Sequence, residues 1–218
     1  MHFRKVRLHS PEQSLGTLSA FYGEVLELPE LTVGETTLEF APGEGGPFYH
    51  FALLAPGDRL PEVLTWARER VELLPDSESG EVVFDFSNWD AQACYFHDPA
   101  GNIVELIVHR GVGETGTTGQ FAGRELLGVS ELGLVGDTTG MARLLRDELG
   151  LELWDGSLEE GRLAFLGERA RTLILGPAGR GWLPTGRPAE LHPVEAELSG
   201  LPSGSVELEG GLHRICSG

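Results

Sequence analysis

The chain has 218 residues, of which 40% are hydrophobic, enough to bury the core of one large domain or two small ones. Its 16 lysines and arginines against 34 aspartates and glutamates give a net charge of −18, without a basic cluster that could neutralise phosphates. We therefore expect neither nucleic acid nor an anionic membrane as a partner. No apolar run has signal-peptide or membrane-spanning length, and the two cysteines match no disulfide framework, so we expect a cytoplasmic protein.

The N-terminal half contains two copies of one pattern. The first copy has a strand, a helix and further short strands, predicted at residues 3–9, 15–25, 30–33 and 36–40. The second repeats this order at residues 49–54, 60–70, 82–86, 93–96 and 103–109. Residues 1–110 therefore read as two βαβββ units in one domain.

A second domain is expected after a linker. Residues 111–124 are rich in Gly and Thr and show no periodicity, which is typical of a linker. Beyond it, residues 125–218 repeat the strand, turn and helix of the N-terminus, followed by strands at 162–166, 171–175 and 191–198. Too few residues remain after 198 for another complete unit, so we expect the final unit to be abbreviated.

Two motifs give the chain a family resemblance. They are "YFHDPAGNIVEL" at 95–106 and "SAFYGEVLEL" at 19–28, and together with the βαβββ repeat they make the chain resemble the vicinal oxygen chelate superfamily. That group contains glyoxalases, bleomycin resistance proteins and extradiol dioxygenases, and the chain is most similar to its two-domain, dioxygenase-like members. The resemblance implies an α+β fold in which tandem βαβββ modules form curled mixed sheets and a cup.

The resemblance also implies metal ligands on the first and last strands of each module. Matched to this chain, these positions hold His50, Glu105 and Glu39, while the remaining first-strand position holds Arg7 where the family usually has histidine. His9 shares a strand face with Arg7, because side chains of a strand alternate between two faces.

The second half keeps only part of this pattern. Glu131 and His192 occupy first-strand ligand positions there, but the last-strand carboxylate is missing. We therefore expect the C-terminal half to support the first cup or to mediate pairing in a homodimer.

Two explanations of Glu105 remain open, because a carboxylate on an enclosed apolar surface needs a compensating cation. In the first, a divalent metal such as Fe, Mn, Zn or Ni is bound by His50, Glu105 and either Glu39 or His9. In the second, no metal is bound, and Arg7 pairs with Glu105 or Glu39 in its place.

The expected function follows from these alternatives. Trp89 and Tyr95 share one strand parity and are expected to shape a pocket with Arg7, although each could be ordinary aromatic packing. With a metal, the protein would be a dioxygenase or a glyoxalase-like lyase acting on a small molecule. Without one, it would be a small-molecule binding protein of the bleomycin resistance type, or a structural module with a closed cup.

Overall fold

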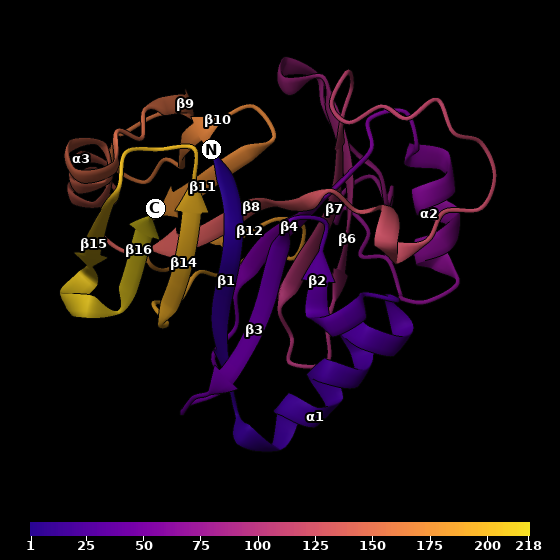
Figure 1. Cartoon of the computed structure of the whole chain (residues 1–218), viewed down its shortest axis with the longest axis horizontal. Helices are drawn as coiled ribbons and strands as arrows, with labels where there is room; N and C mark the ends of the chain where they lie inside the picture. The colour runs from indigo at the N-terminus through magenta and orange to yellow at the C-terminus, as the bar shows by residue number, and fades with distance from the viewer.

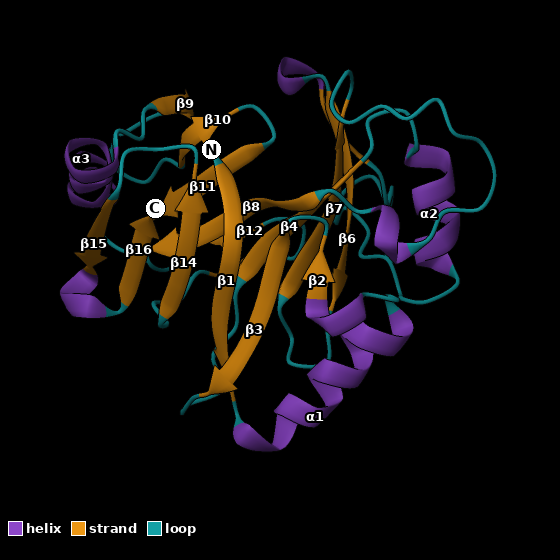
Figure 2. Ribbon diagram, viewed as in Figure 1, coloured by secondary structure: helices purple, strands orange, loops and turns teal.

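The computed structural model describes all 218 residues, and strands make up most of the fold (Figure 2). The α-helices lie at the periphery of two large sheets (Figure 1) and are α1 (Glu12–Ala20), α2 (Leu60–Arg68) and α3 (Thr138–Leu149). A π-helical turn at Phe21–Val25 continues α1, as the predicted helix at 15–25 requires. None of the helices has the length and apolar character needed to span a bilayer.

One sheet has six strands. In spatial order they are β15 (Gly204–Leu208), β16 (His213–Ser217), β14 (Val194–Ser199), β1 (His2–Ser10), β3 (Thr36–Pro42) and β2 (Thr32–Val33). Its centre is the antiparallel pairing of β1 with β14, which joins the first module to the last. The last module has no α-helix between its strands, so the prediction that it is abbreviated is confirmed.

The second large sheet has eight strands. In spatial order they are β5 (Phe84–Phe86), β6 (Ala91–His97), β7 (Ile103–His109), β4 (His50–Ala55), β8 (Gly128–Val135), β11 (Arg171–Gly176), β10 (Ala164–Glu168) and β9 (Leu153–Gly156). Its centre is the antiparallel pairing of β4 with β8, which joins the second module to the third. A small hairpin of β12 (Gly181–Trp182) and β13 (Arg187–Pro188) follows β11. Tandem modules with curled mixed sheets are thus confirmed.

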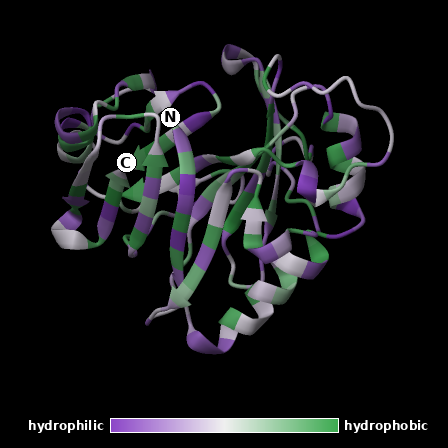
Figure 3. Ribbon diagram, viewed as in Figure 1, coloured by the Kyte–Doolittle hydropathy of each residue, from purple (hydrophilic) through white to green (hydrophobic).

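Modules pair through first strands that have the same burial pattern. Every residue of β4 and β8 is buried, whereas β1 and β14 alternate between buried and more exposed residues. Figure 3 shows the alternation along β1 as successive hydrophobic and hydrophilic bands. A strand with two covered faces fits beside another of the same kind, and an amphipathic strand fits beside an amphipathic one. The two N-terminal modules therefore do not share a cup, in contrast to the arrangement expected from the sequence.

The core lies mainly on the face of each sheet that the helices cover. Along β4, Phe51 and Leu53 enter this large core, while Ala52 and Leu54 enter a smaller apolar cluster on the other face. That opposite face, hereafter the site face, is the one on which the candidate ligands lie.

The Gly- and Thr-rich segment is exposed over most of its length but is anchored at its end. The buried guanidinium of Arg59 donates a hydrogen bond to the Gly119 carbonyl at 2.9 Å and to Glu125 Oε2 at 3.0 Å. Phe121 is also buried and packs edge-on against Trp66 of α2. The connection between the two halves is therefore held against α2.

Candidate metal centre

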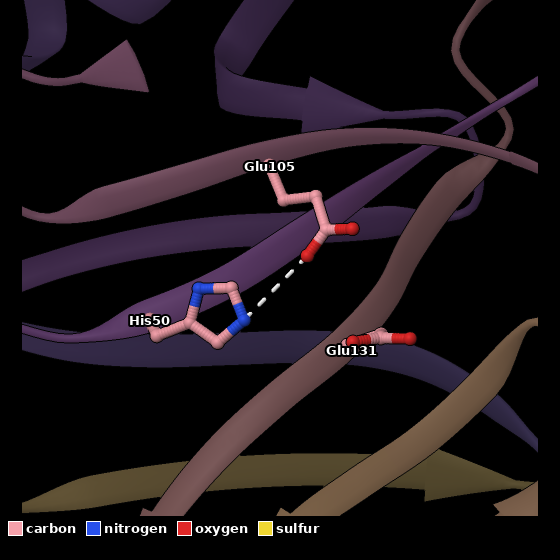
Figure 4. A group of neighbouring side chains, drawn as sticks. All are labelled: His50, Glu105 and Glu131. Carbon is pink, nitrogen blue, oxygen red and sulfur yellow. Dashed lines mark ion pairs between the residues drawn. The ribbon is translucent and has the colours of Figure 1, made fainter. Parts of the chain in front are cut away.

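Three buried side chains converge on the site face of the eight-stranded sheet (Figure 4). His50 begins β4, Glu105 lies in β7 and Glu131 lies in β8. One ligand atom from each lies within 4.8 Å of the others. The arrangement brings one nitrogen donor and two carboxylates to a single point.

Strand register explains why these side chains meet. Ala52 pairs with Glu105 on β7 and with Glu131 on β8, and residues paired directly across strands point to the same face. His50 precedes Ala52 by two residues and so shares that face. Because alanine has only a methyl group, the two carboxylates flank a short gap.

His50 is oriented to offer a lone pair to this gap. Its Nδ1 lies 3.2 Å from the Ile103 carbonyl oxygen, which can only accept, so Nδ1 carries the proton. Nε2 is then unprotonated and lies 3.6 Å from Glu105 Oε2. Burial lowers the pKa of His50 to about 4, which keeps the ring neutral at physiological pH. A neutral imidazole fixed by a hydrogen bond on its other nitrogen is a ready metal ligand.

The two carboxylates are in an unfavourable environment for negative charge. Burial raises the pKa of Glu131 to about 8. Burial, and then the charge of Glu131, raise the pKa of Glu105 well above its ordinary value, and the Tyr95 side chain beside it acts in the opposite direction. The only ion-pair partner of either carboxylate is His50, which is neutral. The pair therefore needs a cation from outside the chain or must retain a proton.

The six-stranded sheet also has two glutamates at the equivalent positions, but the residue between them is an arginine and not an alanine. There Arg7 of β1 pairs with Glu39 on one side and Glu195 on the other, in the same register as Ala52 with its two glutamates. Arg7 Nε lies 3.1 Å from Glu39 Oε1, and Arg7 Nη1 lies 3.3 Å from Glu195 Oε1. Lys5 takes the place of His50, with Nζ 2.7 Å from Glu39 Oε2. A protein cation thus occupies the centre of this second pair.

The predicted ligand set is corrected at two positions. The structure brings His50 and Glu105 together, but Glu39 and His9 lie on the other sheet because β1 pairs with β14 and not with a strand of the second module. Glu39 binds Lys5 and Arg7, and His9 Nδ1 lies 3.0 Å from the Pro42 carbonyl oxygen. Arg7 accordingly belongs to the six-stranded sheet and not to the cavity beside Glu105.

Glu131 takes the place in the candidate ligand set that the sequence gives to Glu39 or His9. The sequence marks it as a first-strand ligand position but assigns it to a separate domain. The signal that could have placed it correctly is the low polarity of β8, in which only Ser130 and Glu131 are polar, since β4 likewise has only His50 as a polar residue.

The third module repeats the strand order of the second, but its position equivalent to Glu105 holds no ligand. In the second module, Ala52 pairs with Glu105, and in the third, the equivalent pair is Gly133 with Ile174. Ile174 therefore stands where a second last-strand carboxylate would be, and it lines the cavity. The donor set is three residues, with an apolar side chain on the fourth side.

A cavity of about 90 Å³ opens over the three ligands. Trp89 and Tyr95, which the sequence places in the pocket, are among its lining residues. The hairpin that follows β11 also contributes: the Trp182 ring lies 5.0 Å from that of His50, between ring centres. Both the second and the third module therefore form its walls.

Comparison with solved structures supports the fold. The chain is similar to a putative dioxygenase from Bacillus subtilis subsp. subtilis str. 168, with 16% identity and a TM-score of 0.57 over 100% of this chain and 85% of that one. It is also similar to a mutant of glyoxalase I from Zea mays, with 12% identity and a TM-score of 0.53 over 99% and 93% of the two chains.

These structural neighbours are consistent with the vicinal oxygen chelate superfamily that the sequence resembles, and at such identities they show the fold alone. A scan against protein-family models and a search of curated proteins find no match.

Proposed function

We propose that the protein is an enzyme of the vicinal oxygen chelate type that uses a divalent metal held by His50, Glu105 and Glu131 to act on a small oxygenated molecule. The observation that carries this proposal is the contrast between Ala52 and Arg7. Two glutamates flank each residue, yet only the exposed pair receives a cation from the chain.

The donor set limits the choice of metal. One imidazole nitrogen and two carboxylates suit borderline and hard divalent ions such as Mn²⁺, Fe²⁺, Zn²⁺ and Ni²⁺, and they do not favour soft ions that prefer thiolates. Three protein ligands with Ile174 on the fourth side leave coordination positions open to a substrate. Such a bound ion supplies Lewis acidity toward substrate oxygens, the chemistry that dioxygenase and lyase reactions of this type have in common.

The surrounding residues prepare the site for that role. Ile103 holds the His50 ring in one tautomer, and Trp182 packs against the same ring and limits the access of water. Tyr95 lies beside Glu105 as its cross-strand neighbour, where its hydroxyl can orient the carboxylate or a substrate oxygen.

Metal analysis of protein purified without chelator and then reconstituted with Mn²⁺ tests the proposal. We expect about one equivalent of bound metal in the wild type, and at least about a hundredfold weaker binding in Glu105→Ala, because a ligand is lost. Glu39→Ala is the matched control, since it removes the equivalent carboxylate from the other sheet, and it should bind metal as the wild type does. Absence of bound metal in reconstituted wild type would contradict the proposal.

A metal-free binding protein of the bleomycin resistance type is the second candidate. Its support is that buried carboxylates also attract an organic cation. In that case Mn²⁺ would leave the melting temperature unchanged, whereas an organic cation of suitable size would raise it.

A further inference from the structure

The cavity above the three ligands contains one cationic side chain, Arg180. It lies in the loop between β11 and the small hairpin and is half-buried. Its guanidinium makes one hydrogen bond, from Nη1 to the Gly181 carbonyl at 3.0 Å, and has no carboxylate within ion-pairing distance. Glu105 and Glu131 line the same cavity but form no ion pair with Arg180, so its guanidinium is available to bind an anion.

The mouth of the cavity is aromatic and preorganised. Trp89 stacks on Phe86 with ring centres 5.5 Å apart, and Phe165 of the third module meets it edge-on at 4.8 Å. The Trp89 indole N–H also donates a hydrogen bond to Asp155. These contacts hold the indole in place before any ligand arrives, and all three rings line the cavity. Such a surface favours a flat apolar group.

The size of the cavity limits which ligands can contact both Arg180 and the aromatic mouth. A volume of about 90 Å³ is about three times the share of one water molecule in the liquid, so the enclosed part accepts only a small group. The remainder of a larger ligand would lie along the aromatic mouth. Because the arginine and the three ligand residues line the same small cavity, one small molecule can reach both.

From these observations we infer that the substrate of this site is a small aromatic compound carrying a carboxylate or similar anionic group, and that Arg180 is the residue that recognises the anion. The inference rests on the proposed function, because it names the substrate class of the same site. Its basis is independent of the metal: an unpaired arginine and a fixed aromatic wall facing one cavity.

The test compares probes and variants in chelator-treated protein. Binding of benzoate, benzamide and acetate is followed by quenching of tryptophan fluorescence, since Trp89 and Trp182 line the cavity. We expect benzoate to bind more tightly than benzamide or acetate, because only benzoate offers both a ring and a charge. Arg180→Gln should weaken benzoate binding about tenfold or more and leave benzamide binding unchanged, as loss of a charge-assisted hydrogen bond predicts. Arg180→Lys should restore part of the loss.

Arg143→Gln is the matched control, because Arg143 is exposed on α3 away from the cavity, and it should bind all three probes as the wild type does. Equal binding of benzoate and benzamide, absence of benzoate binding, or an Arg180→Gln variant that binds benzoate normally would each overturn the inference. The two proposals fail separately, because this titration contains no metal and the metal analysis contains no probe.

Discussion

The two sheets of this protein present the same arrangement of acidic groups and treat it differently. In the six-stranded sheet, Glu39 and Glu195 are more than one third exposed and are joined by Arg7. In the eight-stranded sheet, Glu105 and Glu131 are almost fully buried, and Ala52 lies between them. The chain thus places a cation between the two carboxylates that water can solvate, and places none between the two that are buried, where an unpaired charge is costly. The difference supports our proposal that the buried pair binds a cation that the chain does not supply.

The largest expected effect comes from making the buried pair resemble the exposed one. In Ala52→Arg, a guanidinium would bridge Glu105 and Glu131 as Arg7 bridges its own glutamates, and bound metal should fall from about one equivalent to near zero. Metal analysis and the loss of any Mn²⁺-dependent rise in melting temperature would show this.

Ala52→Met is the matched control, because it adds comparable length without charge. It should keep measurable metal binding, since both carboxylates remain uncompensated. If Ala52→Met loses the metal as completely as Ala52→Arg does, the size of the side chain and not its charge prevents metal binding. The explanation drawn from the contrast between the two sheets would then be wrong.

A smaller effect is expected in the pH dependence of stability. Without metal, the folded state keeps a proton on Glu131, whose pKa is raised to about 8, whereas the unfolded chain has released that proton at its ordinary pKa. The folded state therefore binds more protons in this window, and the free energy of unfolding should fall as pH rises, by about 1 kcal/mol per pH unit. Urea unfolding in chelator between about pH 7.5 and 8.5 measures this slope, because the unfolded-state protons of His50, His109 and His213, whose folded pKa values are lowered, are largely released below that range.

The double variant Glu105→Gln, Glu131→Gln should lose this slope, because neither amide titrates. Saturating Mn²⁺ should also remove it, since the metal-bound carboxylates are already deprotonated in the folded state. A free energy of unfolding that increases with pH in the metal-free wild type would be inconsistent with a buried, protonated pair.

The smallest effect is expected from Arg7→Ala. Because Arg7 and its partners are more than one third exposed, loss of these ion pairs should lower the free energy of unfolding by only about 0.5–1 kcal/mol. The pKa of Glu39, now held below its ordinary value chiefly by Lys5 and also by Arg7, should rise. Chemical denaturation with Arg143→Ala as control would test this, and a loss of several kcal/mol would contradict the contrast in burial.

Much of the fold could be predicted from the sequence, because each module is specified locally. Helix α3 begins after Asp137, whose carboxylate accepts a hydrogen bond from the Gly140 N–H at 3.1 Å, and ends at Gly150 with φ of 68°. Such signals, with the strand alternation, are sufficient to locate modules. They do not specify which module pairs with which, because sheet contacts between modules join residues far apart in the chain.

Only those residues of the candidate site that lie in a single module could be predicted. His50 and Glu105 come from the same module, and the family resemblance places both of them on its first and last strands. The third candidate ligand depends on the pairing of β4 with β8, so the sequence places Glu131 in another domain and predicts either Glu39 or His9 instead. Comparison of strand character would have favoured Glu131, since β4 and β8 each contain few polar residues, whereas β1 alternates between polar and apolar residues.

The interleaved pairing of modules makes the two halves of the chain interdependent. His50 and Glu105 are contributed by residues 1–110, Glu131 by residues 125–218, and each large sheet draws strands from both segments. Severing the backbone within the exposed stretch before Phe121 would thus yield two fragments, each with an incomplete coordination set and two unpaired central strands. Neither fragment would be competent by itself, and mixing them should reconstitute ion binding together with both sheets, a behaviour suited to split-protein complementation.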